Sequence, residues 1–235
     1  MSALLEEVRR ARREPELAVL EGFHAVKHAI RFGAEIERMV CADHAEVAEL
    51  AAALAPDVAE RVAAAEEIGE DPTVVPAAGR IVAIARRPVV DVAAVLADPA
   101  PRRVVLLEEP RRLGNIGACV RVAAAADAAA VLTTGPADPW HPDALRGAAG
   151  LHFALPVARI DDLPVSDRPL LAIDPDGAPL GDAPLPARAV LAFGTERHGL
   201  TGALLARADA RVSIPMREGV SSLNLATAVA VTLYA

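Results

Sequence analysis

The sequence is poor in several residue types, and each shortage excludes a class of structure. Its 235 residues include only two cysteines, which are not spaced as a CxxC pair, so a disulfide framework and a zinc motif are both excluded. Aromatic residues make up 3% of the chain, so the core must consist mainly of Ala, Val and Leu. The first ten residues contain no apolar signal core, and no run is long enough to span a membrane. We expect a cytoplasmic protein with no metal site.

Lysine is almost absent, because Lys27 is the only one among the 24 basic residues. Anion binding must therefore depend on arginine. The net charge of −8 argues against broad, non-specific binding of nucleic acid. Arginine pairs nevertheless occur in several places, namely Arg86–Arg87, Arg102–Arg103 and Arg111–Arg112. Such pairs are either solvated surface residues or local contacts to RNA.

The first part of the chain is typical of a compact α/β domain, which we place at residues 1–87. Strand patterns at 17–20, 36–41 and 80–85 alternate with helical patterns at 1–16, 23–32 and 45–54. A short helix is expected at 66–69, and residues 58–65 fit no single pattern. A stretch with three prolines follows at 88–103, and it reads as a linker with some helix.

The second part, residues 104–235, predicts a parallel sheet covered by helices. Apolar strand patterns are found at 104–107, 130–133, 151–157, 169–174, 189–194 and 212–216. Helical patterns follow from about 116, at 143–150 and from 223 to the end, where Leu223, Ala226, Ala230 and Leu233 form one stripe. This alternation of strand and helix indicates an α/β fold.

Three loops in this part carry polar residues where a ligand can bind. The first, G-N-I-G-A-C-V-R, joins a strand to a helix and contains Asn115 and Arg121. It is neither a G-x-G-x-x-G nor a Gly-Lys-Ser/Thr motif, so a dinucleotide-dependent enzyme is poorly supported. The second, L-A-F-G-T-E-R-H-G-L, has Glu196 at its tip, whereas His198 reads as a turn residue. A carboxylate after a parallel strand is either solvated or a ligand group.

The third loop, I-P-M-R-E-G-V-S-S-L-N-L, lies between the last strand and the last helix. Ser221 or Ser222 can cap that helix. The loop brings two hydroxyl groups, the Asn224 amide and free main-chain N–H groups to a helix N-terminus, which is a natural site for an anion or a polar ligand.

Together, the three loops resemble the three motifs of the SpoU/TrmH branch of the SPOUT RNA methyltransferases. The first motif is matched by Asn115, Gly117, Ala118 and Arg121, the second by Gly194, Glu196 and Gly199, and the third by Ile214, Pro215, Met216, Ser222, Leu223, Asn224 and Ala228. Thr195 replaces the usual Asn of the second motif, and Asp127 stands where the family usually has Gly. Residues 1–87 are similar to the L30e-like domain that often precedes this fold, through E-G-F-H-A-V at 21–26.

The resemblance implies a deep C-terminal trefoil knot, a homodimer, and transfer of a methyl group from S-adenosylmethionine to a ribose 2′-hydroxyl of RNA, with ribosomal RNA favoured. A transfer-RNA methyltransferase and a non-catalytic RNA-binding protein are the alternatives. It implies catalytic roles for Arg121, Asn115, Glu196, Ser222 and Asn224. It implies cofactor binding by Phe193, Gly194, Thr195, Glu196, Gly199, Ile214, Met216, Ser222 and Leu223. Arg86, Arg87, Arg111, Arg112 and Arg146 are the expected contacts to RNA.

Overall fold

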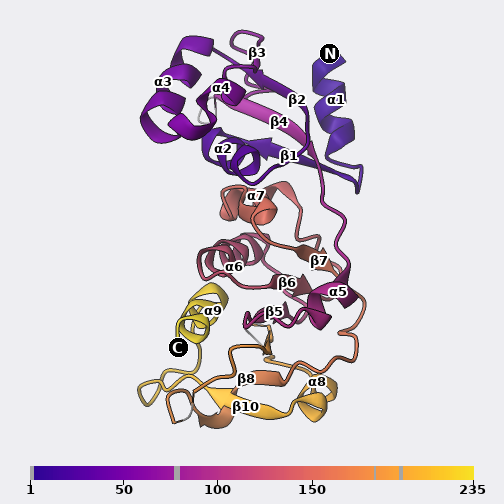
Figure 1. The fold of residues 1–235 in the computed structure, drawn as a ribbon, viewed down its shortest axis with the longest axis vertical. Helices are drawn as coiled ribbons and strands as arrows, with labels where there is room; N and C mark the ends of the chain where they lie inside the picture. Colours follow the sequence, from indigo (N-terminus) through magenta and orange to yellow (C-terminus); the bar gives the residue numbers. More distant parts are fainter. Residues whose placement is uncertain (1–2, 77–79, 183, 196–197) are drawn as a thin grey trace. The chain divides into compact units, whose positions relative to one another are not determined.

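The computed structural model describes residues 3–76, 80–182, 184–195 and 198–235. Contacts divide the chain into two compact units, which we describe separately (Figure 1). The first unit contains residues 1–89 and 140–154, and the second contains residues 90–139 and 155–235. The sequence placed the segment 140–154 with the second part of the chain, whereas the structure packs it with the first.

The first unit is built around a four-stranded sheet of order β1-β4-β2-β3. Its elements are α1 (Ala3–Ala11), β1 (Leu17–Glu21), α2 (Phe23–Arg31), β2 (Ile36–Cys41), α3 (His44–Leu54), η1 (Pro56–Val58), α4 (Ala59–Val62), β3 (Glu66–Glu67), β4 (Ile81–Arg86), α7 (Pro142–Gly147) and η2 (Leu151–Phe153). The helix expected at 66–69 was wrong, because Glu66 and Glu67 pair in parallel with Val40 and Cys41.

The segment 140–154 joins this unit through close main-chain packing. Gly150 has φ 76°, and a Cβ at this position would lie 2.3 Å from the Ala25 carbonyl oxygen. Trp140 packs against His152 and Phe153, with ring centroids 5.0 and 5.2 Å apart. The strand expected at 151–157 is therefore a 3-10 turn followed by a short strand. In so short an apolar run, periodicity does not distinguish a 3-10 turn from a strand.

The second unit has a six-stranded parallel sheet of order β10-β8-β9-β5-β6-β7. Its elements are α5 (Val92–Ala97), β5 (Val104–Leu107), α6 (Leu113–Ala125), β6 (Ala130–Thr133), β7 (Val157–Arg159), β8 (Leu170–Pro179), β9 (Val190–Phe193), α8 (Gly202–Arg207), β10 (Ala210–Ser213) and α9 (Leu225–Leu233). The central strands are fully buried, as expected for apolar runs in a parallel sheet. None of the described helices is long and apolar enough to cross a membrane.

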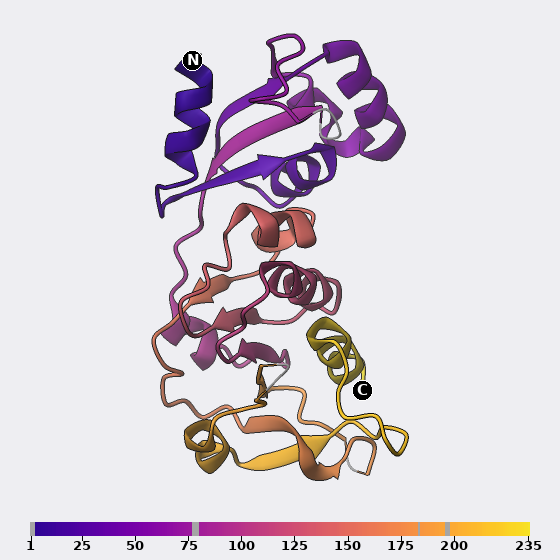
Figure 2. The same cartoon turned by 180° about the vertical axis from the view of Figure 1, so that it is seen from behind.

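The last helix differs from the sequence prediction at its start and in its buried face. Asn224 caps α9 by accepting a hydrogen bond of 2.9 Å from the Ala226 N–H, so the serines do not act as the cap. The buried residues are Leu225, Ala226, Val229 and Thr232. Helix α9 lies beside α6, as the two views in Figures 1 and 2 agree. Leu223 therefore belongs to the preceding loop and is available to a ligand.

Asp127 follows α6 in the left-handed conformation, with φ 52°. This conformation is the one that glycine adopts most easily after a helix, while Asp tolerates it through its short polar side chain. The replacement of the family's usual Gly by Asp127 therefore lies at the end of a helix.

Candidate functional site

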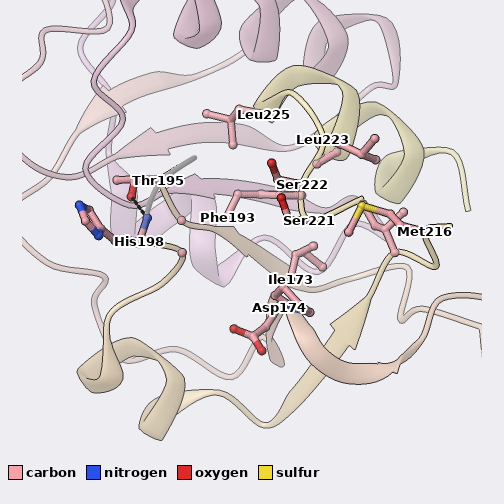
Figure 3. A pocket seen from close by; sticks show the side chains of 15 residues that line it. Ile173, Asp174, Phe193, Thr195, His198, Met216, Ser221, Ser222, Leu223 and Leu225 are labelled. Atoms are coloured by element: carbon pink, nitrogen blue, oxygen red, sulfur yellow. Dashed lines mark hydrogen bonds between the residues drawn. The ribbon is translucent and has the colours of Figure 1, made fainter. Parts of the chain in front are cut away.

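A cavity of about 380 Å³ lies in the second unit, beside the ends of β9 and β10 and the middle of β8 (Figure 3). Ligands of open parallel sheets bind at these carboxyl ends. The described residues that line it are Ile173, Asp174, Pro175, Phe193, Gly194, Thr195, His198, Gly199, Ile214, Met216, Ser221, Ser222, Leu223, Leu225 and Ala228. Eight of the nine residues expected to bind a cofactor are among them. The ninth, Glu196, lies outside the described residues.

One wall is the turn that follows β9. The main chains of Thr195 and Gly199 exchange two hydrogen bonds of 3.1 and 3.0 Å, and Gly199 has φ 63°. A Cβ on Gly194 would lie 2.0 Å from the Gly199 carbonyl carbon, so only glycine fits there. The Thr195 hydroxyl accepts a hydrogen bond of 3.1 Å from the His198 N–H. Thr195 therefore holds the turn closed, which gives the cavity a wall made of main chain.

A second wall is the loop from Ile214 to Leu223, which continues from β10. Ser221 and Ser222 are exposed, and Figure 3 shows their hydroxyl groups beside Leu223 and Met216. Asn224 fixes the end of this loop, because it caps α9 and also donates a hydrogen bond of 3.2 Å to Asn115 Oδ1. The structure thus joins the first and third motifs through two amide side chains that are 109 residues apart.

The third wall comes from β8, which the sequence analysis did not assign to the site. Strand β10 pairs with Leu171 and Ala172, then skips to Ala178 and Pro179, so residues 173–177 form a bulge. Bulges of this kind redirect side chains. Asp174 is the only acidic side chain among the described lining residues, and its Oδ1 accepts a hydrogen bond of 3.0 Å from the Asp176 N–H. Its position after the apolar run 170–173 was the available signal, since carboxyl ends of parallel strands carry ligand groups.

Of the expected catalytic residues that the structure describes, Ser222 lines the cavity, whereas Asn115, Asn224 and Arg121 do not. Arg121 lies on α6 with an exposed side chain. The buried face of α6 is formed by Ile116, Gly117, Cys119, Val120 and Ala123. Arg121 is therefore available to a molecule outside its own chain's cavity.

The five arginines expected to contact RNA fall into two groups. Arg86 forms ion pairs with Glu35 and Glu37 at 3.3 and 2.5 Å. Arg87 donates a hydrogen bond of 2.6 Å to the Leu17 carbonyl. Arg146 pairs with Glu21 at 3.0 Å and with Asp143 at 2.9 Å, and the bond to Glu21 raises the pKa of Arg146. By contrast, Arg111 and Arg112 are exposed at the start of α6.

The chemistry of the cavity suits a mostly apolar molecule with several polar groups. Ile173, Phe193, Ile214 and Leu225 offer apolar surface, while the turn and loop offer main-chain groups and hydroxyls. Only one carboxylate is present among the described lining residues. The described residues contain no group of three or more His, Cys, Asp or Glu side chains able to hold a metal ion. A heterocycle with a short polar tail fits this lining.

Comparison with known proteins agrees with this description. The model of the SpoU rRNA Methylase family matches residues 102–234. The 23S rRNA guanosine 2′-O-methyltransferase RlmP of Bacillus subtilis is 33% identical over 141 residues, which cover 57% of this chain and 57% of RlmP. An uncharacterised tRNA/rRNA methyltransferase of Mycobacterium tuberculosis is 38% identical over 169 residues, which cover 66% of this chain and 58% of the relative. The matched part of the chain thus spans a little over half the length of these relatives.

Solved structures extend the likeness to the whole chain. The SpoU methyltransferase AviRb of Streptomyces viridochromogenes, in complex with the cofactor AdoMet, has a TM-score of 0.82 and 24% identity, covering 100% of this chain and 96% of AviRb. An RNA 2′-O ribose methyltransferase has a TM-score of 0.70 and 26% identity, covering 97% and 93%. The α/β fold expected from the sequence is confirmed.

Proposed function

The chain belongs to the SpoU rRNA methylase family, and on this basis we propose that it transfers a methyl group from S-adenosylmethionine to a ribose 2′-hydroxyl of ribosomal RNA. The proposal rests on the cavity of about 380 Å³ described above, because eight residues predicted from the sequence motifs line it. The choice of substrate is supported by the similarity to RlmP, whose name describes the same reaction on 23S rRNA.

The cavity has the features that this cofactor needs. The missing Cβ of Gly194 leaves room for main chain to pass close to main chain, and Thr195, His198 and Gly199 of the turn line the space together with Ile214, Met216 and Leu223 of the loop. Phe193, Ile214 and Leu225 would surround the adenine, and Asp174 and Ser222 would bind polar groups of the ribose or the methionine portion. When bound, S-adenosylmethionine supplies a methyl group on a positively charged sulfur.

The residues of this chain then have to hold the acceptor hydroxyl in line with that methyl group. Alignment alone lowers such a barrier by several kcal/mol. Asn224 donates a hydrogen bond to Asn115 and ends the loop that carries Ser222. We assign Asn115, Ser222 and Asn224 to one group of side chains around the acceptor. They orient the ribose, with Glu196 assigned to the same role by the motif.

Arg121 would act on the RNA. A guanidinium keeps its proton at neutral pH, so a role as a general base is disfavoured. We assign it to an RNA phosphate and to the negative charge that develops on the 2′-oxygen. Because Arg121 does not line the cavity of its own chain among the described residues, we infer a homodimer in which the partner copy completes each site.

The remaining features of the proposal concern the rest of the chain. Residues 1–87 would form an L30e-like domain that binds the RNA substrate, residues 88–103 a linker, and residues 104–235 the knotted methyltransferase domain of a cytoplasmic protein. Arg111 and Arg112 would contact RNA phosphates, since both are exposed at the start of the helix that carries Arg121. Local arginines are needed because the net charge of the chain is −8.

Calorimetric titration with S-adenosylmethionine tests the cavity. We expect one cofactor per chain and no binding by Ala228→Phe, because the new ring fills the space that Ala228 lines. The control is Ala203→Phe, which makes the same exchange at an exposed position of α8. Binding by Ala228→Phe would contradict the assignment of the cavity.

Methyl transfer is measured with radiolabelled cofactor and ribosomal RNA. A 2′-O-methyl group protects the adjacent phosphodiester from alkaline cleavage, so the label should appear in an alkali-resistant dinucleotide. Label in mononucleotides would indicate a base methyltransferase. Cofactor binding without transfer to either ribosomal or transfer RNA would favour a non-catalytic RNA-binding protein.

A further inference from the structure

A second cavity, of about 310 Å³, lies within the first unit and has no part in the proposed methyl transfer. It is lined by Ile30 at the end of α2, by Ile36, Glu37, Arg38 and Met39 of β2, and by Arg61 and Ala64 in and after α4. Ile30, Ile36 and Met39 give it apolar walls, and two guanidinium groups lie at its border. Its volume exceeds that of a single nucleobase and leaves room for part of the ribose.

The strand that forms this cavity has an irregular and partly uncovered edge. The pairing of β2 with β4 shifts between Ile36 and Arg38, so Glu37 is a bulge. On the other side, β3 pairs only with Val40 and Cys41. The residues from Ile36 to Met39 therefore have no β3 residue opposite them, and all four line the cavity. Main-chain groups of such a strand can pair with the edge of a base.

Arg38 provides a donor that lacks an acceptor. Its Nη2 forms an ion pair of 2.6 Å with Glu66, whereas its Nε is buried and has no hydrogen-bond partner among the described atoms. A buried donor without a partner is costly unless a ligand or water satisfies it. Arg61 is held at the border, because its Nη1 donates a hydrogen bond of 2.9 Å to the Ile30 carbonyl.

The charges around the cavity favour a neutral ligand over a phosphate. Glu66 offsets Arg38, and Glu37 lines the cavity while pairing with Arg86 at 2.5 Å. Apolar walls and flat guanidinium groups together suit a flat heterocycle, because arginine planes stack on bases.

We propose that this cavity binds one unpaired nucleobase of the RNA substrate, an inference that rests on the proposed function because it takes RNA as the ligand. The base would stack between the apolar wall and the guanidinium groups of Arg38 and Arg61. Recognition would then depend on a base being free of its helix.

Fluorescence anisotropy with two short probes tests the proposal on the full chain without cofactor. The probes are a single-stranded RNA decamer of mixed sequence and a decamer with the same backbone but no bases. We expect the wild-type protein to prefer the first by about tenfold, a typical value for one stacked base. Ala64→Leu fills the cavity from an exposed position and should abolish the preference. Equal binding of the two probes by the wild-type protein would overturn the proposal.

Two matched controls separate base binding from general damage. Ala63→Leu makes the same exchange at the neighbouring exposed residue, which does not line the cavity, and should behave like the wild type. Arg38→Met removes a guanidinium group from the cavity and should reduce the preference, whereas Glu66→Gln breaks the ion pair and leaves the guanidinium group in place. An equal loss in both variants would overturn stacking on Arg38, because the ion pair would then account for the effect.

The methyl-transfer assay distinguishes failure of this proposal from failure of the proposed function. We expect Ala64→Leu to raise KM for the RNA substrate about tenfold without changing kcat or the Kd of S-adenosylmethionine. Transfer with an unchanged KM would overturn the nucleobase site alone. Absence of cofactor binding and transfer in the wild type would overturn the methyltransferase, and the probe preference would still decide the nucleobase site.

Discussion

Arginine side chains have different partners in the two units. In the first unit they pair mainly with carboxylates, as Arg31 does with Asp57 and Arg146 with Glu21. In the second unit, five of the described arginines donate to main-chain carbonyls, namely Arg103, Arg159, Arg168, Arg188 and Arg207. Arg168 has four such acceptors, in Val95, Leu96, Asp98 and Arg102. It is 3% exposed, and burial lowers its pKa. Together with Arg188, which donates to the Leu96 and Asp98 carbonyls, it supplies donors to the carbonyls at the end of α5.

The comparison changes how clusters of arginine in this chain are interpreted. Arg86, Arg87 and Arg146 were predicted to contact RNA, yet each is engaged with a carboxylate or a carbonyl of its own unit. Arg111, Arg112 and Arg121, in or next to α6, are exposed, as Arg86 and Arg146 also are. The five RNA contacts predicted from the sequence stay predictions, and the partners of each arginine now give a way to test them separately.

The largest effect of a substitution is expected for Arg168, an arginine that stabilises the fold. Arg168→Met should lower the free energy of unfolding of the second unit by about 4 kcal/mol. The Val95 and Arg102 carbonyls lose the donor that Arg168 supplies, and those of Leu96 and Asp98 keep only Arg188. Urea denaturation measures this change. Arg211→Met, at an exposed position of β10, is the control and should change stability by less than about 0.5 kcal/mol. Equal stability of the two variants would mean that Arg168 stabilises the fold no more than an exposed arginine does.

The second-largest effect is expected for Arg121, an arginine to which we assign a role in the reaction. Arg121→Ala should lower the rate of methyl transfer by about a hundredfold, since removal of one group that stabilises transition-state charge typically costs this much. Its melting temperature and cofactor affinity should stay unchanged, because the side chain is exposed and does not line the cavity. Single-turnover kinetics and calorimetry provide the two measurements. A loss of stability together with activity would assign Arg121 to the fold.

The smallest effect compares an exposed with a paired arginine. Arg112→Gln should weaken binding of the RNA substrate and reduce the slope of log K against log salt by about 1, as expected for a lost phosphate contact. Arg86→Gln should leave the slope unchanged, because Glu35 and Glu37 already neutralise this side chain. Filter binding at several salt concentrations measures both. Equally reduced slopes for the two variants would indicate that Arg86 also contacts an RNA phosphate.

Local patterns were enough to predict much of the fold and of the cavity. The strands at Val104–Leu107, Ala130–Thr133 and Ile36–Cys41 have the predicted bounds, because each is a short apolar or alternating run between polar residues. The cavity residues were predicted from the resemblance of three loops to the motifs of a known family. The structure gives the physical reason for one of these residues, because a Cβ on Gly194 would collide with Gly199.

The sequence by itself thus determined the α/β class and the loops that line the cavity, since both depend on neighbouring residues. Only the tertiary structure decided that Asp174 lines the cavity from a bulge, that residues 140–154 pack with the first unit, and that Asn224 caps α9 and binds Asn115. It also decided the partners of the arginines, as for Glu21 and Arg146, which are 125 residues apart. The physical reason is that hydrophobic periodicity and turn residues act over a few positions, whereas ion pairs and hydrogen bonds form between whichever groups packing brings together.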